Sequence, residues 1–120
     1  MSDLTRKDVI MILATTETAR LTGVDLSGLD LSGLNFAGAN LIRADLSGTD
    51  LTNAYMRHCV LEEADLEGAI LVNANFRDAN LKGCNLKGAQ LQGANLTDAN
   101  LSGVELDAMQ KEQAKGVWLP

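Results

Sequence analysis

Aromatic residues and proline are scarce in this sequence of 120 residues: aromatics make up 3% of it, and Pro120 is the only proline. A core built mainly from large rings is therefore not expected. No apolar run approaches the length of about 18 residues that a membrane-spanning helix needs, and a hydrophobic fraction of 46% excludes a disordered chain. Basic residues are also few, 10 against 16 acidic ones, and the net charge of −6 argues against direct binding to nucleic acid or to anionic membranes.

Cysteine and histidine are too few to build a site on their own. The two cysteines, Cys59 and Cys84, lie far apart in the sequence, and His58 is the only histidine. A disulfide scaffold or a zinc site needs more ligands than these. We therefore expect both thiols to be packed inertly, and no metal or other cofactor to be bound.

A signal for export is not found either. The apolar stretch Val9–Ala14 has six residues, fewer than the about 7–15 of a signal-peptide core, and Asp3 and Asp8 interrupt the segment before it. The expected location is therefore the cytoplasm.

The sequence is rich in one thing, a repeat of five residues. Large apolar residues occupy every fifth position from Leu21 to Leu106, and 15 of these 18 centres are leucine. A helix turns about 100° per residue and would spread these leucines around its surface, whereas a strand would point alternate ones outward. A short extended piece followed by a sharp turn keeps the centre and the small residue two before it on the inside. Glycine follows many centres by two, where such a turn needs a positive φ.

The few centres that are not leucine indicate four units per coil. Phe36, Met56 and Phe76 recur at every fourth unit, so they stack in one column if four units close a square coil. Successive coils would then pair through their backbones at a spacing of about 4.8 Å. Eighteen units at four per coil make about 4.5 coils.

This repeat resembles that of the pentapeptide-repeat family, whose motif is A(D/N)LxG. Ala44–Gly48 and Ala64–Gly68 match it in full, and the resemblance extends over about residues 19–108. It implies an all-β solenoid, a right-handed quadrilateral β-helix in which the centre and the residue two before it face inward.

The N-terminal end of such a stack needs a cap, because its backbone edge would otherwise invite aggregation. Residues 1–18 are predicted to supply one, with a helix over about residues 5–17. Thr5 and Asp8 have the spacing of a capping box, and an apolar stripe follows them. The β-helix over residues 19–108 and its caps would form a single domain of 1–120.

Residues 109–120 are predicted to cap the other end. Asp107 can cap a short helix over about residues 108–115, and Gly116 can terminate it. The apolar residues 117–119 would cover the last coil.

Outward positions must carry any function, and the middle of the prism departs most from the motif. Exposed tyrosine and arginine are typical anchors of protein interfaces. The alternative is drift of the repeat, since solvent-facing positions tolerate many residues. The candidate interaction surface consists of Tyr55, Arg57, His58, Glu62, Glu63 and Arg77.

A second feature is an acidic ladder, because Asp25, Asp45 and Asp65 fall on one wall. These side chains could hold a cation or mimic a phosphate backbone, or they could simply accept local backbone hydrogen bonds. Quinolone-resistance members of the resembling family mimic DNA and bind type II topoisomerases. Their prisms are longer and dimerise through the C-terminus, whereas the short prism expected here favours a monomer.

The residue types do not favour an enzyme. His58 has no outward-facing serine or cysteine beside it in sequence, and Glu62 and Glu63 are neighbours whose side chains need not converge. A prism filled with leucine is also expected to leave no cavity for a substrate. We therefore expect a noncatalytic module that binds an unidentified protein partner or serves a structural role.

Overall fold

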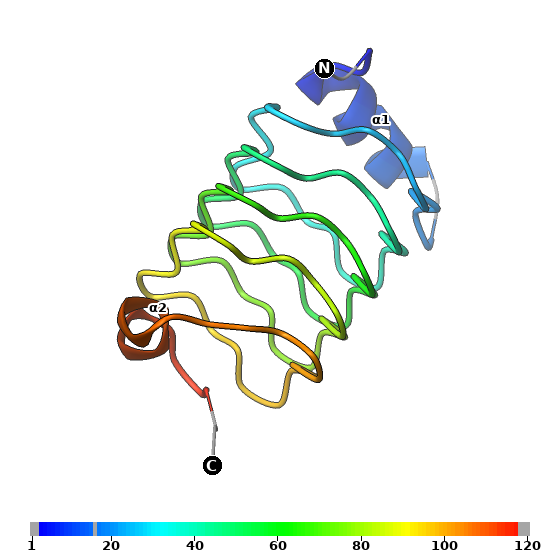
Figure 1. Cartoon of the computed structure of the whole chain (residues 1–120). Helices are drawn as coiled ribbons and strands as arrows, with labels where there is room; N and C mark the ends of the chain where they lie inside the picture. Colours follow the sequence, from blue (N-terminus) through cyan, green and yellow to red (C-terminus); the bar gives the residue numbers. More distant parts are fainter. Residues whose placement is uncertain (1–2, 16, 118–120) are drawn as a thin grey trace.

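The computed structural model describes residues 3–15 and 17–117 (Figure 1). Helix α1 (Arg6–Thr15) lies at one end of a stack of rectangular coils, and helix α2 (Ala108–Gln113) lies at the other. In the described residues the coils contain no extended strands. Single parallel bridges join them instead at the residue before each centre, except at the positions one coil after Asn85 and Gln90.

Each bridge joins residues that lie four pentapeptides apart, for example Asp45 and Asp65, or Tyr55 and Asn75. The bridging residue is the one before each centre. Its N–H donates to a carbonyl oxygen of the coil before, and its own carbonyl oxygen accepts the N–H of a centre in that coil. For Asp45 these partners are Val24 and Leu26. Four pentapeptides per coil, as the Phe36 column predicts, are therefore confirmed.

Every pentapeptide turns at the residue two after its centre. From residue 23 to residue 103 each fifth residue has a positive φ, and the N–H after it donates to the carbonyl oxygen of the centre. This geometry is that of a type II turn, which favours glycine. Ten of these positions are glycine, and the other seven are Arg43, Asn53, His58, Glu63, Asn73, Asp78 and Asp98. Arginine and glutamate rarely adopt this conformation, so Arg43 and Glu63 lie in strained backbone.

The interior of the prism is filled by the centres and the small residues two before them. Phe36, Met56 and Phe76 are all buried, as predicted. Cys59 and Cys84 are buried in the small-residue column, and their thiols donate to carbonyl oxygens at 2.8 Å. Burial raises the pKa of each thiol to about 12. The prediction of inert packing is confirmed.

Helix α1 begins with the predicted capping box. The N–H of Thr5 donates to Oδ2 of Asp8 (2.9 Å), and the N–H of Asp8 donates to Oγ1 of Thr5 (3.2 Å). These bonds from Thr5 hold the pKa of Asp8 below its usual value. On the next turn Val9 is buried with the core of the prism, so the helix covers the first coil.

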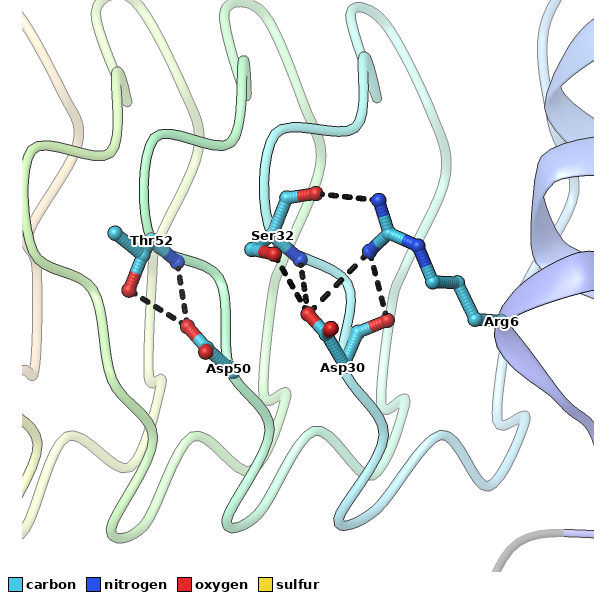
Figure 2. A network of polar contacts seen from close by, with 5 residues as sticks. All are labelled: Arg6, Asp30, Ser32, Asp50 and Thr52. Atoms are coloured by element: carbon cyan, nitrogen blue, oxygen red, sulfur yellow. Dashed lines mark hydrogen bonds and ion pairs between the residues drawn. The ribbon is translucent and has the colours of Figure 1, made fainter.

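Arg6 of α1 covers part of the backbone edge of the first coil, at Asp30 and Ser32 (Figure 2). Its guanidinium donates from Nη1 to the carbonyl oxygen of Asp30 (3.0 Å) and from Nη2 to that of Ser32 (2.9 Å). One coil on, the carbonyl oxygens of Asp50 and Thr52 accept backbone N–H groups of the first coil at 2.8 and 2.9 Å. The guanidinium therefore stands in for two N–H groups of a coil that would precede the first.

Helix α2 has the predicted N-cap. Oδ1 of Asp107 accepts the N–H of Gln110 (2.8 Å), and Oε1 of Gln110 accepts the N–H of Asp107 (3.1 Å). The side chain of Gln110 is buried, and its Nε2 donates to the carbonyl oxygens of Leu86 (2.8 Å) and Ala89 (3.0 Å). In the coil before, the N–H of Gln90 donates to the carbonyl oxygen of Ala69. Gln110 occupies the position one coil after Gln90, so its side chain replaces the bond that its own backbone would make.

The predicted end of this helix is wrong. It stops at Gln113 rather than near residue 115, and Gly116 does not terminate it. Instead the backbone turns extended at Ala114, and Lys115 bridges to Asn95 in the same register as the coils. The helix therefore replaces one pentapeptide without shifting the stack. Of the expected apolar cover, residue 117 packs partly buried against the core, and residues 118–119 lie outside the described residues.

Candidate functional site

The four units of a coil make four walls, and each wall is a column that contains every fourth unit of the chain. Wall 1 contains the unit centred on Leu21 and those stacked on it, and walls 2, 3 and 4 begin with Leu26, Leu31 and Phe36. The six residues of the candidate surface, called the middle band below, occupy two adjacent walls. Wall 4 and its corner with wall 1 carry Tyr55, Arg57, His58 and Arg77, and wall 1 carries Glu62 and Glu63.

Two residues of the middle band, Arg57 and His58, lie against Asp78, which is not part of the predicted surface. Nη2 of Arg57 lies 3.2 Å from Oδ2 of Asp78, and Nε2 of His58 lies 3.9 Å from the same oxygen. The hydrogen bond to Asp78, followed by that to Tyr55, raises the pKa of Arg57. Asp78 follows His58 by one full coil, so the period of the coil was the signal that could have identified it.

The guanidinium of Arg57 is held but not fully satisfied. Among the described residues, its Nε is a buried side-chain nitrogen without a hydrogen-bond partner. Tyr55 beside it is 39% exposed. One coil on, Arg77 exposes its side chain on the same wall, while its N–H donates to Oδ1 of Asn75 (3.1 Å). The wall therefore presents a tyrosine and two arginines within adjacent coils.

The two glutamates of the middle band have separate partners. Oε1 of Glu62 accepts a bond from Nδ2 of Asn80 (3.3 Å), whereas Oε2 of Glu63 lies 3.9 Å from Nη1 of Arg43. Because the side chains of Arg43 and Glu63 are 64% and 67% exposed, this ion pair contributes little stability. The carboxylates of Glu62 and Glu63 do not form an acid–base pair with each other.

The acidic ladder on wall 2 makes mostly local hydrogen bonds. Oδ1 of Asp25 accepts the N–H (2.9 Å) and the hydroxyl (2.6 Å) of Ser27, and Asp45 binds Ser47 in the same way. The hydroxyl of Ser27 and then its N–H lower the pKa of Asp25. Oδ1 of Asp65 accepts the N–H two residues on and a longer bond from the next coil. In the part of the chain that is described, no cluster of three or more His, Cys, Asp or Glu residues could hold a metal ion.

Comparison with known proteins decides the family. A family model described as pentapeptide repeats matches residues 19–57, 59–98 and 74–108, with eight copies in all. The chain belongs to the pentapeptide-repeat family. A search of the curated proteins finds no match.

Solved structures of other pentapeptide-repeat proteins have a similar fold. HetL from the cyanobacterium Nostoc sp. PCC 7120, involved in heterocyst differentiation regulation, is 39% identical with a TM-score of 0.70; the match covers 71% of this chain and 39% of HetL. Rfr23 from Cyanothece 51142 is also 39% identical (TM-score 0.57), with 76% of this chain and 59% of Rfr23 covered. The Arabidopsis thaliana thylakoid lumen protein AT2G44920 is 27% identical (TM-score 0.72), with 97% of this chain and 86% of that protein covered. The chain thus spans less than two thirds of HetL or Rfr23.

The surface of this pentapeptide-repeat prism carries hollows outside the filled interior, and two of them lie near the last coils. The larger, of about 660 Å³, lies between residues 83–88 and the segment that leads into α2. The smaller, of about 250 Å³, includes Glu62, Glu63 and Lys82 in its lining. Sequence analysis did not predict either hollow because both form on the outside of the filled core. Neither α1 nor α2, the helices of the described residues, is long and apolar enough to cross a membrane.

Proposed function

We propose that this chain is a noncatalytic repeat module that binds a protein partner through the middle band. The observation that carries the proposal is the arrangement of Arg57, which is paired with Asp78 at 3.2 Å while 35% of its side chain stays exposed. Tyrosine and arginine dominate the binding energy of many protein interfaces.

Preorganisation supports this choice of surface. An arginine that is free in solution loses rotamer entropy when a partner fixes it, and this loss weakens binding. Here the ion pair with Asp78 at 3.2 Å already restricts Arg57, and bridges on both sides fix the backbone of Tyr55. A partner would gain contacts to these groups without the full entropic cost of ordering them.

The chemistry of the described residues supports a noncatalytic role. Both thiols are buried, and their pKa of about 12 leaves almost no thiolate at neutral pH. His58 faces Asp78 rather than a serine or cysteine nucleophile. The carboxylates of Glu62 and Glu63 are directed to different partners, so they do not share a proton.

Affinity co-purification from the source organism tests the proposal. We expect the wild type to recover a specific partner, and Arg57→Glu/Glu62→Lys/Glu63→Lys to lose it. Lys7→Glu/Asp3→Lys/Glu17→Lys changes the net charge equally at the N-terminal end and should retain the partner. Thermal unfolding of all three proteins checks that the variants are folded. A partner that both variants retain, or both lose, would contradict the middle band as the binding surface.

A further inference from the structure

The hydrogen-bonded ladder between coils opens at one place on wall 2. In the coils before it, the centre and the turn glycine both donate to the following coil: the N–H of Leu66 binds Asn85 (2.8 Å), and that of Gly68 binds Lys87 (2.9 Å). Among the described residues, the N–H groups of Leu86 and Gly88 make no such bonds, and the bridge column of this wall ends at Asn85.

The opening has a physical cause in the C-terminal cap. Wall 1 still pairs one unit earlier, where the N–H of Gly83 donates to the carbonyl oxygen of Ser102 (2.8 Å). After Gly103 the chain leaves the stack, because Asp107 must become the N-cap of α2 and Gln110 must reach beneath the last coil. The larger hollow lies between the two separated segments.

The groups that face this opening have the pattern of a β-ladder. Two N–H donors, of Leu86 and Gly88, lie two residues apart on one backbone edge, and the carbonyl oxygen of Cys84 has no backbone donor within the described chain. One coil earlier, the equivalent set is paired with an extended segment, residues 85–87. The complement of such an edge is another extended peptide backbone, as in β-strand addition.

The charge around the hollow selects the kind of peptide. Glu105 and Asp107 line the larger hollow together with Lys87. The smaller hollow shares Gly83 and Gly103 with it and adds two glutamates and one lysine. Acidic side chains therefore outnumber basic ones around these two neighbouring hollows, which are together called the groove below.

We infer that this groove binds an extended, basic peptide segment of a partner protein, which pairs with the backbone edge at Leu86 and Gly88. The segment takes the place of a wall 2 unit of the last coil. Its basic side chains face the acidic rim, which consists of Glu62, Glu63, Glu105 and Asp107. This site does not depend on the middle band for its backbone contacts, and the two surfaces are distinguishable by the amides they affect.

A peptide that copies residues 79–93, with Cys84→Ala, is a suitable probe. In the fold this segment supplies the carbonyl oxygens that pair with Leu66 and Gly68, and it carries two lysines and no acidic residue. Titrated into the full chain and followed by NMR, it should shift the amide resonances of Leu86 and Gly88, slow their hydrogen exchange, and bind with a Kd below about 1 mM.

Matched controls test the contribution of charge to this binding. The same peptide with Lys82→Glu/Lys87→Glu should bind more weakly, as should the original peptide to a Glu105→Lys variant of the protein. Glu17→Lys, at the opposite end, should bind as the wild type does.

Three results would overturn the inference. The amides of Leu86 and Gly88 could exchange as slowly in the free protein as those of Leu66 and Gly68, which would mean that the chain closes its own edge. The peptide could fail to bind, or bind equally well with glutamates. Shifts confined to Arg57 and Arg77 would place the peptide on the middle band instead.

Discussion

Replacing Arg6 should open the N-terminal end of the prism. Arg6→Met keeps an apolar stem in place of the side chain but removes the donors to the carbonyl oxygens of Asp30 and Ser32. A hydrogen bond from a charged donor contributes roughly 1.5–3 kcal/mol when it is buried. Here the Arg6 side chain is 39% exposed, and that of Asp30 63%, so water can replace part of the loss. We expect a total destabilisation of about 1–2 kcal/mol, with little from the ion pair itself.

The loss should be local, because stability in a repeat stack is a sum of neighbouring terms. Hydrogen exchange should accelerate by about tenfold for the first-coil amides of Leu31 and Gly33, since a destabilisation of about 1.4 kcal/mol corresponds to a factor of ten. The exchange rate of Asn100, near the other end, should remain unchanged. Thermal unfolding should show a Tm lower by a few degrees. Lys7→Met, the neighbouring position on the same helix, is the control and should have no such effect. Equal exchange in both variants, or acceleration spread over all coils, would refute the role of the guanidinium as a substitute for backbone donors.

Four further predictions concern other parts of the molecule. Gly116→Ala should displace the segment that follows α2, because a Cβ at this position would lie 2.7 Å from the backbone of Thr97. The amide of Leu96 donates to the carbonyl oxygen of Lys115 in this segment, so its hydrogen exchange should become faster. The free energy of unfolding should fall in acid. Bonds from the serine two residues on lower the pKa of Asp25 and of Asp30 in the folded protein relative to the unfolded chain. The stability that these bonds contribute is therefore present above about pH 4 and is lost as the pH falls through the folded-state pKa, which denaturant titrations at several pH values can check. Both cysteines should resist thiol reagents in the native protein and react on unfolding, and rapid native labelling would contradict their burial. The carboxylates of the acidic ladder already accept hydrogen bonds, so calorimetry with calcium or magnesium should give no binding heat, and gyrase supercoiling should be unaffected. Binding heat would favour the cation-binding alternative, and an effect on supercoiling would favour the DNA-mimic alternative.

The repeat made much of the fold predictable from the sequence. Since the side chains of Phe36, Met56 and Phe76 recur at every fourth pentapeptide, they specify both the number of walls and the column that each residue joins. The same period places His58 beside Asp78, so this neighbour was predictable in principle. What the period could not supply is the choice of partner: Arg57 pairs with Asp78 because of side-chain rotamers, which a pattern of residue types does not determine.

The caps were only partly predictable for a related reason. Helix N-caps have a local signature, and those at Thr5 and Asp107 were correctly identified. The docking of Arg6 and Gln110 depends on partners more than one coil away along the chain, with no local sequence signal. The return of Lys115 to the register of Asn95 was also missed, because a helix was expected to end the stack rather than to replace one unit of it.

At each end of the prism the backbone of a terminal coil lacks a neighbouring coil to pair with, and side chains replace only part of that pairing. At both, a side chain replaces backbone donors of a missing coil: Arg6 for two carbonyl oxygens, and Gln110 for that of Ala89. The single side-chain amide of Gln110 can replace a backbone donor on only one wall. The turn into α2, which positions Gln110, also separates the chain from the wall before it. The open edge at Leu86 and Gly88 is therefore a consequence of how this end is capped. A short, acid-rimmed edge of this kind is poorly suited to sheet-to-sheet aggregation, which favours long and flat edges, but it is accessible to a single extended segment.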